Sequence, residues 1–146
     1  MKEQLLTLRI DWRDMDLLGH VNNLAIVSYF QSARVLFSES IGLAAYPGME
    51  LGPIEAATQV QFTKQLRYPG QVTVHTTLIE IKNTSFIIEH RIVDDAGDVA
   101  AVGREVIVCF DFVKQVKTPI PKAVRTKLEA RLPETKLGSS PCDARS

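Results

Sequence analysis

Residues 14–42, DMDLLGHVNNLAIVSYFQSARVLFSESIG, decide the fold, because an acidic loop passes directly into one long apolar segment. From residue 24 to residue 41 the apolar side chains recur at intervals of three and four, which predicts an α-helix. Asn22 or Asn23 is the expected N-cap, and Gly42 is placed to end the helix. The first half of the helix is apolar on nearly every side. We therefore expect it to be deeply buried, with other elements wrapped around it.

The remainder of the chain is dominated by segments with the pattern of β-strands. Before the loop, apolar residues alternate with polar ones as in a half-buried strand, and these apolar residues are Leu6, Leu8, Ile10 and Trp12. Turn-forming residues separate four later predicted strands, Glu55–Leu66, Gln71–Ile81, Ser85–Val93 and Val99–Val113. The tight turns imply largely antiparallel neighbours in a meander. We predict an α+β fold in which a curved antiparallel sheet of about five strands wraps around one long central helix, with a short helix over Pro121–Leu132 outside it.

Length and composition point to a single domain. The chain has 146 residues, of which 45% are hydrophobic, enough for one core that we assign to residues 1–132. Residues 133–146 have few large apolar side chains and are expected to form a flexible tail. Lys and Arg total 17, as do Asp and Glu, so no net charge attracts the chain to nucleic acid or to an anionic membrane.

The N-terminal residues, the lengths of the apolar runs and the two cysteines indicate the compartment and the redox state. The N-terminal residues lack the apolar core of a signal peptide, and no run approaches the roughly 20 apolar residues of a membrane span. We therefore expect a cytoplasmic protein. Cys109 lies in a predicted strand and Cys142 in the predicted tail. The two cysteines have no metal-like spacing and no evident reason to pair, so no disulfide framework is predicted.

The loop over residues 14–23 places acids and an imidazole at the start of the helix. An acid beside the exposed backbone N–H groups of a helix N-terminus can attack a carbonyl or deprotonate water while those amides stabilise an oxyanion. Asp14 could simply accept hydrogen bonds from the turn. His20 follows Asp16 by four residues, so it could bond the acid, orient water, protonate a leaving group, or only fix the loop. No second His or Cys lies at ligand spacing, so no metal is predicted.

Several segments, taken in order, carry a family resemblance. They are the strand before DMDLLGHVNN, the helix with Ala33-Arg34, then VQFTKQLRYPGQVTV (60–74), TSFIIEHRIVDDAGD (84–98) and VIVCFDF (106–112). In these features the chain resembles hotdog-fold acyl-CoA thioesterases of the 4-hydroxybenzoyl-CoA thioesterase family. The resemblance covers nearly all of residues 5–125. Each segment alone is unspecific, whereas their order and spacing together are distinctive.

The resemblance implies roles for the loop residues. Asp16 would be the catalytic carboxylate, acting as a nucleophile or as a general base for water. The backbone N–H of Asn23 would point at the thioester carbonyl, and Gly19 would permit close approach of chain and substrate. His20 falls inside the same motif. Because a thioester is already activated, a carboxylate and one or two amides suffice without a cofactor, coenzyme A being part of the substrate.

The resemblance also indicates where the acyl-CoA would lie, and where this chain departs from its relatives. Many relatives carry Tyr at the position of Ile26 and Pro at the position of Gln65. An apolar Ile26 favours an aliphatic acyl group, although Tyr29 could compensate from the next helical turn. Other candidate substrate-binding residues are the basic residues Lys64, Arg67 and Arg91 for coenzyme A phosphates, and the turn hydroxyls Thr84 and Ser85.

His75 and His90 lie in predicted strands with no acidic partner adjacent in the pattern, and they are expected to be structural.

A single curved sheet leaves a free strand edge, which two copies could cover by joining edge to edge. We therefore expect a homodimer. The resemblance implies active sites at the dimer interface and permits a tetramer built from two dimers.

Two other functions remain open at this stage. The first is a hotdog enoyl-CoA hydratase or dehydratase, although the Asn-Pro motif usual in that class is absent. The second is a non-catalytic acyl-CoA binding protein, against which the intact acid argues.

Overall fold

The computed structural model describes residues 2–133 of the chain. Its helices are α1 (Asn23–Ser40) and α2 (Lys122–Glu129), and a short 3₁₀ turn, η1, spans Trp12–Asp14. Its strands are β1 (Gln4–Arg9), β2 (Leu51–Phe62), β3 (Gln71–Ile81), β4 (Ser85–Val93), β5 (Val99–Asp111) and β6 (Val116–Lys117).

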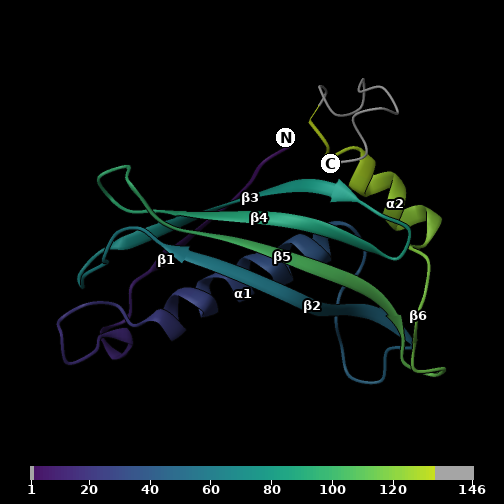
Figure 1. Cartoon of the computed structure of the whole chain (residues 1–146), viewed down its shortest axis with the longest axis horizontal. Helices are drawn as coiled ribbons and strands as arrows, with labels where there is room; N and C mark the ends of the chain where they lie inside the picture. The colour runs from purple at the N-terminus through teal and green to yellow at the C-terminus, as the bar shows by residue number, and fades with distance from the viewer. Residues whose placement is uncertain (1, 134–146) are drawn as a thin grey trace.

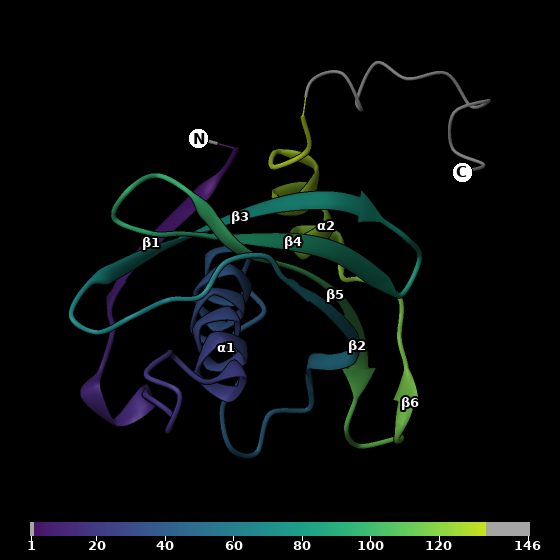
Figure 2. The same cartoon turned by 60° about the vertical axis from the view of Figure 1, so that its left-hand side comes forward.

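The strands form one antiparallel sheet that curves over α1 (Figure 1), and Figure 2 shows the sheet arching across the helix from one side to the other. The order across the sheet is β1-β3-β4-β5-β2, with β6 paired to the end of β5. The predicted α+β class and the sheet wrapped around one helix are confirmed, and this is the hotdog fold. The predicted meander is wrong in one connection, because β2 pairs with β5 rather than with β3.

The core lies between α1 and the concave face of the sheet. Strand residues alternate between buried and partly exposed along β3 and β4, as one-sided burial of an antiparallel sheet requires. On α1 the buried residues follow helical spacing, and they are Ala25, Ile26, Tyr29, Phe30, Ala33, Phe37 and Ser38. Gly103 on β5 lets the helix approach closely, because a Cβ atom there would lie 2.7 Å from the Phe30 ring.

Burial of α1 differs from the prediction. The first half of the helix was expected to be deeply buried, but Leu24 is 81% exposed and Val27 is also exposed, as is Val35 further along the helix. The sheet covers one face of the helix only. Leu24 and Val35, which this chain leaves in contact with water, lie beside the edge strand β2, because each lines a cavity together with residues of that strand.

The bounds of strands β1 and β2 differ from the predicted ones. β2 spans Leu51–Phe62 rather than residues 55–66. It begins earlier because Pro53 lies on an edge strand where a missing N–H is tolerated, and residues 63–66 belong to the connection that follows it. β1 ends at Arg9, so Trp12 does not continue the inner face but lies in η1 with 71% exposure. β6 was not expected.

The predicted C-terminal helix is present, but it does not pack outside the core: Val124 and Leu128 are buried in the same cluster as Phe37 and Phe86, so α2 closes one end of the core. Most of the predicted tail, from residue 134 onward, lies outside the described residues, as does Cys142. Cys109 is buried in β5, and burial raises the pKa of its thiol to about 11. Across residues 2–133, no helix is long and apolar enough to cross a membrane.

Candidate active site

The loop that precedes α1 is held in shape by a network of backbone hydrogen bonds. Met15 and Val21 pair as an isolated antiparallel bridge, and the Gly19 N–H donates to the Asp16 carbonyl to close the turn between them. Gly19 adopts a φ of +82°, which explains the glycine. A Cβ atom there would meet nothing within 4 Å, so the backbone conformation, and not crowding by this chain, calls for glycine.

Asp16 lies at the turn with one carboxylate oxygen engaged and one open. Its Oδ1 accepts the backbone N–H of Leu18 at 2.9 Å and that of His20 at 3.2 Å. Among residues 2–133, nothing donates to Oδ2. The turn therefore orients the carboxylate through one oxygen and leaves the other available to a substrate or a water molecule.

The N-terminus of α1 supplies backbone donors that have no partner within residues 2–133. Asn22 is the N-cap, and its Oδ1 accepts the N–H of Ala25 at 2.8 Å while its Nδ2 donates to the Asp14 carbonyl at 2.8 Å. The N–H groups of Asn23 and Leu24 have no acceptor in the described part of the chain, as is usual in a first helical turn. The predicted Asn23 donor is thus joined by a second donor, from Leu24, that the motif did not indicate.

These groups open onto one cavity of about 550 Å³. Its lining comes from the loop, from the first turn of α1 and from the segment that follows β2, and consists of Asp16, Leu18, His20, Val21, Asn22, Asn23, Leu24, Ile26, Phe62, Thr63, Lys64, Gln65 and Leu66. The volume falls in the range of small-molecule sites, roughly 300–1,000 Å³. The predicted residues Asp16, His20, Asn23, Ile26 and Lys64 are therefore brought together. Phe62 and Leu66 were missed, because they reach the cavity only through the position of β2 at the edge of the sheet and of the connection after it.

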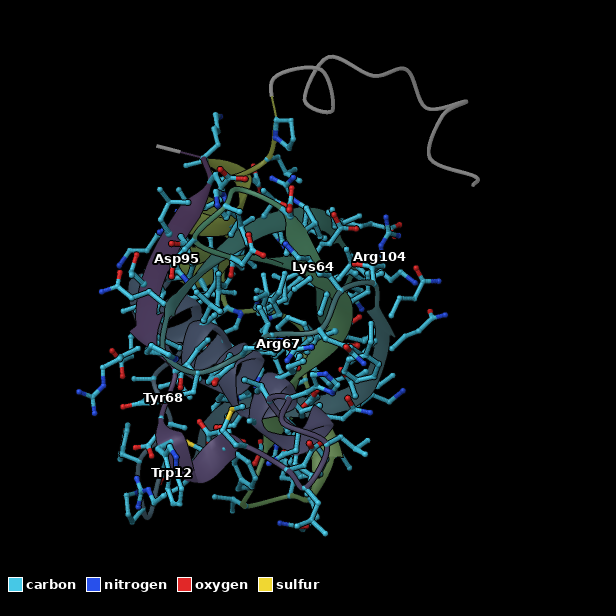
Figure 3. All side chains as sticks on the ribbon, turned by 90° about the vertical axis from the view of Figure 1, so that its left-hand side faces the viewer. Trp12, Lys64, Arg67, Tyr68, Asp95 and Arg104 are labelled. Atoms are coloured by element: carbon cyan, nitrogen blue, oxygen red, sulfur yellow. The ribbon has the colours of Figure 1, made fainter. Side chains whose placement is uncertain are left out.

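The imidazole of His20 contacts Arg67 rather than Asp16. Arg67 Nη2 lies 3.2 Å from His20 Nε2, and guanidinium can only donate, so Nε2 is the acceptor and the ring proton is on Nδ1. Only the backbone N–H of His20 bonds the Asp16 carboxylate. Figure 3 shows Arg67 and Lys64 at the end of the molecule that carries the start of α1.

The other predicted cation near the cavity is already paired. Lys64 Nζ lies 2.6 Å from Asp94 Oδ2 and 2.7 Å from Asp98 Oδ2. Hydrogen bonds from these two carboxylates raise the pKa of Lys64. The ammonium group of Lys64 is therefore neutralised locally, whereas Arg67 has no carboxylate partner within residues 2–133.

Tyr29 does not line the cavity. It is 6% exposed, and its hydroxyl donates to Asp14 Oδ2 at 3.2 Å. Burial, followed by the charge of Asp14, raises the pKa of the Tyr29 phenol well above its usual range. Asp14 thus anchors α1 to the loop, a structural position as expected, although its side-chain partner is a phenol rather than a turn N–H.

Three predicted substrate-binding residues lie away from this cavity. Arg91 is on β4 and pairs with Glu3 at 3.3 Å. Thr84 and Ser85 are at the β3–β4 turn, where the Thr84 carbonyl accepts the N–H of Cys109. That turn adjoins the core around the C-terminal half of α1, so within one chain these hydroxyls do not approach Asp16.

A buried ionic chain, missed by sequence inspection, connects the sheet to α1. His90 and Glu105, both nearly unexposed, bond at 2.5 Å, and Thr76 Oγ1 lies 2.7 Å from the other ring nitrogen. Arg34 Nη1 lies 2.6 Å from Glu105 and 2.7 Å from Glu55. His75 likewise has an acidic partner, because its Nδ1 lies 3.1 Å from Glu3 Oε1. Both acids were overlooked because they come from other segments.

The pKa values of Glu55 and Glu105 are shifted in opposite directions by their surroundings and by each other. Burial, and then the hydrogen bond and charge of Glu105, raise the pKa of Glu55 to about 7. Burial opposes ionisation of Glu105, but its hydrogen bonds with His90 and Glu55 outweigh burial and lower its pKa to about 2. Glu105 is therefore the ionised member, held by Arg34 and His90.

Comparison with known proteins identifies the family. A sequence model of the thioesterase-like superfamily matches residues 10–128, which is most of the chain. The chain belongs to the thioesterase-like superfamily. Membership makes it a thioester hydrolase, and the cavity beside Asp16 is the place where the fold offers both a carboxylate and free amide donors. A search of curated protein sequences gave no significant match.

Solved structures agree with membership of this thioesterase superfamily. A predicted thioesterase from Bacillus stearothermophilus superposes with a TM-score of 0.80 at 27% identity, covering 89% of this chain and 96% of its own. A gentisyl-coenzyme A thioesterase gives a TM-score of 0.75 at 27% identity, with 84% and 99% covered. A Staphylococcus aureus protein solved in complex with coenzyme A shares the fold, with a TM-score of 0.82 at 13% identity and coverage of 93% and 92%.

Proposed function

We propose that this thioester hydrolase acts on an acyl-CoA, releasing the free acid and coenzyme A, with Asp16 as its catalytic carboxylate. The observation that carries the proposal is the geometry of one cavity wall. In the described part of the chain, Asp16 has a free Oδ2, Asn23 and Leu24 have free N–H groups, and all three residues line the same cavity. The coenzyme A thioester is proposed because a similar structure is a gentisyl-coenzyme A thioesterase.

The reaction follows from these groups. Asp16 either attacks the thioester carbonyl carbon or removes a proton from a water molecule that attacks it. Negative charge then develops on the carbonyl oxygen, where amides at the helix N-terminus stabilise it. Collapse breaks the carbon–sulfur bond, and the thiolate leaves and takes up a proton. If Asp16 is the nucleophile, an acyl–Asp16 anhydride remains, and water hydrolyses it to the free acid and the regenerated carboxylate; if Asp16 is the base, the attacking water has already supplied the acid oxygen. Either way one water molecule is consumed for each acid and thiol formed, and the proposed reaction needs no further cofactor.

We assign His20 and Gly19 supporting parts. Gly19 allows the turn that aims Asp16, and the backbone N–H of His20 fixes Oδ1. While Arg67 donates to His20 Nε2, that nitrogen cannot protonate a thiolate. His20 Nε2 can therefore serve as a proton donor only after Arg67 moves to another partner, for which a substrate phosphate is suitable; until then only the Nδ1–H of the ring can donate.

Among the three basic candidates, we propose Arg67 as the contact for a coenzyme A phosphate. Guanidinium groups suit phosphate recognition because they offer paired donors. Arg67 is exposed near the cavity and has no carboxylate partner in the described residues, whereas Lys64 is neutralised by two acids and Arg91 is paired with Glu3. Thr84 and Ser85 could contact the substrate only from another subunit.

We propose a homodimer as the working unit, with a dimer of dimers as the larger alternative. β2 is an edge strand of the sheet, and the exposed apolar residues Leu24, Val27 and Val35 lie on the face of α1 beside it. A second copy placed against this edge would cover the strand and the helix face together. Phe62 and Leu24, which line the cavity, are on that surface.

We propose the reducing cytoplasm as the place of action, with which the buried free thiol of Cys109 is compatible.

The test is to incubate the protein with hexanoyl-CoA and with trans-2-hexenoyl-CoA and to follow two signals, free thiol and the absorbance of the conjugated double bond. Thiol release from hexanoyl-CoA is the expected result. Loss of the double bond without thiol release would identify a hydratase instead. Tight binding with neither signal would identify a binding protein and would contradict the proposal.

A further inference from the structure

The floor of the cavity beside Asp16 is built from aliphatic side chains. Val21, Ile26 and Leu66 are 5%, 3% and 3% exposed, and all three line the cavity. They come from the loop, from α1 and from the connection after β2, and the Val21 N–H donates to the Leu66 carbonyl at 2.8 Å. That hydrogen bond joins two sides of the floor and satisfies both backbone groups. The most buried lining side chains are therefore apolar, and the Val21 N–H and the Leu66 carbonyl are already hydrogen-bonded to each other.

The polar side chains of the lining are either engaged elsewhere or placed at the mouth. Asn22 caps α1 and bonds the Asp14 carbonyl, and the Thr63 hydroxyl donates to the Val99 carbonyl at 2.9 Å. Lys64 is held by two aspartates. The remaining polar lining residues, all exposed or half-buried, are Asp16, His20, Asn23 and Gln65. These groups can meet the thioester and the coenzyme A arm, but none of them is on the buried floor.

A phenol that could have reached the floor is directed away from it. Tyr29 lies one helical turn after Ile26, but its hydroxyl donates a hydrogen bond to Asp14, and the residue does not line the cavity. A hydroxyl group carried by the acyl end of a substrate would thus lose its water without gaining a partner from Val21, Ile26, Leu66 or Tyr29.

We propose that the acyl group accepted by this cavity is an unsubstituted hydrocarbon group, without hydroxyl or charged substituents. This inference rests on the proposed acyl-CoA thioesterase function. It separates the chain from the gentisyl-coenzyme A thioesterase that it resembles in structure, because a gentisyl group is a dihydroxybenzoyl group. The shared fold fixes the place of the thioester, whereas the floor residues of this chain select the acyl end.

The test compares substrates in pairs that differ by one hydroxyl, benzoyl-CoA with 4-hydroxybenzoyl-CoA and hexanoyl-CoA with 6-hydroxyhexanoyl-CoA. The expected result is a kcat/KM larger for the unsubstituted member of each pair by roughly tenfold to a hundredfold, the range that an apolar pocket achieves against an added hydroxyl. Equal values, or a preference for the hydroxylated member, would overturn the inference.

Binding to the Asp16→Asn variant keeps the two proposals separable. If the wild-type protein releases no thiol from any of the four substrates, the hydrolase proposal fails. Calorimetric titration of the same pairs into the variant still reports which acyl end the cavity prefers. Tighter binding of the unsubstituted members then supports the hydrocarbon floor, and equal or reversed affinities overturn it.

Two further variants locate the selectivity. Val21→Thr places a hydroxyl on the floor at nearly constant shape, and it should reduce the discrimination within each pair severalfold. Tyr29→Phe removes the phenol hydroxyl, and it should leave the ratio within each pair unchanged whatever it does to the absolute rate. A change of ratio in Tyr29→Phe without one in Val21→Thr would show that Tyr29 reaches the acyl group, and would overturn the inference.

Discussion

Arg34 is a residue whose charge matters more than its partial exposure implies. It is 19% exposed and contacts Glu105, which is 2% exposed, so its removal would leave a buried carboxylate that keeps its hydrogen bond with His90 but loses its arginine. We predict that Arg34→Met lowers the free energy of unfolding by about 3–5 kcal/mol, the usual cost of breaking a buried pair. Urea denaturation followed by circular dichroism measures this loss.

Arg104 offers the matched control. It also pairs with a glutamate, Glu89, at 3.0 Å, but its own side chain is 57% exposed. Figure 3 labels it on the sheet, away from Arg67. Arg104→Met should cost at most about 1 kcal/mol, as exposed ion pairs do. Equal losses in the two variants would contradict the buried role of Arg34.

Glu55 gives the protein a specific pH dependence. Its pKa is raised from 4.5 to about 7 in the folded chain, where Arg34 and Glu105 face it. A raised carboxyl pKa means that the folded state retains a proton that the unfolded state releases. The stabilising contribution of the protonated form is therefore complete below pH 4.5 and is lost as the pH rises through about 7.

Glu55→Gln, which mimics the protonated side chain, removes this dependence. We predict that the free energy of unfolding of the wild-type protein falls relative to the variant as the pH rises from about 5 to about 8. Urea denaturation of both proteins at several pH values provides the comparison. Parallel curves over that range would exclude the raised pKa.

The residues of the site divide into those that the sequence reveals and those that it does not. Asp16, His20 and Asn23 are close in the chain, so the geometry of one turn and one helix start brings them together without long-range information. Phe62 and Leu66 join them only through the path of the chain after β2. Glu105 escaped notice as the partner of His90 because the contact crosses between two strands and depends on their register.

At the scale of elements, the start of α1 is the feature on which the site depends most. Asn22 uses both ends of its amide, capping Ala25 and holding the loop through Asp14. We predict that Asn22→Ala costs about 1 kcal/mol, within the range for lost N-caps of roughly 0.5–2 kcal/mol. Thermal denaturation measures the loss, and thiol release should also fall because the Asn23 and Leu24 amides lose their fixed position.

Ser28→Ala is the control on the same helix, since Ser28 is exposed and lies outside the cavity lining. It should keep stability within about 0.5 kcal/mol, as is usual for surface substitutions. A loss in Asn22→Ala no larger than in Ser28→Ala would show that the cap contributes nothing.

Element types were readable from the sequence, whereas the pairing of β2 was not. The periods of alternation assign β3 and β4 with their observed bounds, because each strand buries one face. For β2, the alternation of residues along the strand would be the same whether the strand pairs with β3 or with β5. Its partner is decided by how the whole sheet closes over α1, which is a non-local property of the fold.

For the whole molecule, the exposed apolar face of α1 beside β2 predicts a dimer. Val27, on that face, is 39% exposed in the single chain. We predict that Val27→Asp yields a folded monomer, because a charge placed in an apolar interface loses its water without gaining a partner. Sedimentation velocity measures the assembly state, and circular dichroism confirms folding.

Val113→Asp is the matched control, because Val113 is 71% exposed in the turn between β5 and β6. It should leave the dimer intact. A wild-type protein that sediments as a monomer, or a Val27→Asp variant that remains dimeric, would contradict this mode of assembly.

Whether Asp16 is the catalytic carboxylate is decided by the kcat/KM for thiol release from hexanoyl-CoA by Asp16→Asn and by Asp14→Asn, each compared with the wild-type protein. The two aspartates lie in the same loop, but only Asp16 opens onto the cavity, and the Asp14 side chain bonds Tyr29. We predict a loss of at least about a hundredfold for Asp16→Asn, as expected when an acid–base or nucleophilic group is removed, and less than about tenfold for Asp14→Asn. Equal losses in the two variants, or an active Asp16→Asn protein, would contradict the account.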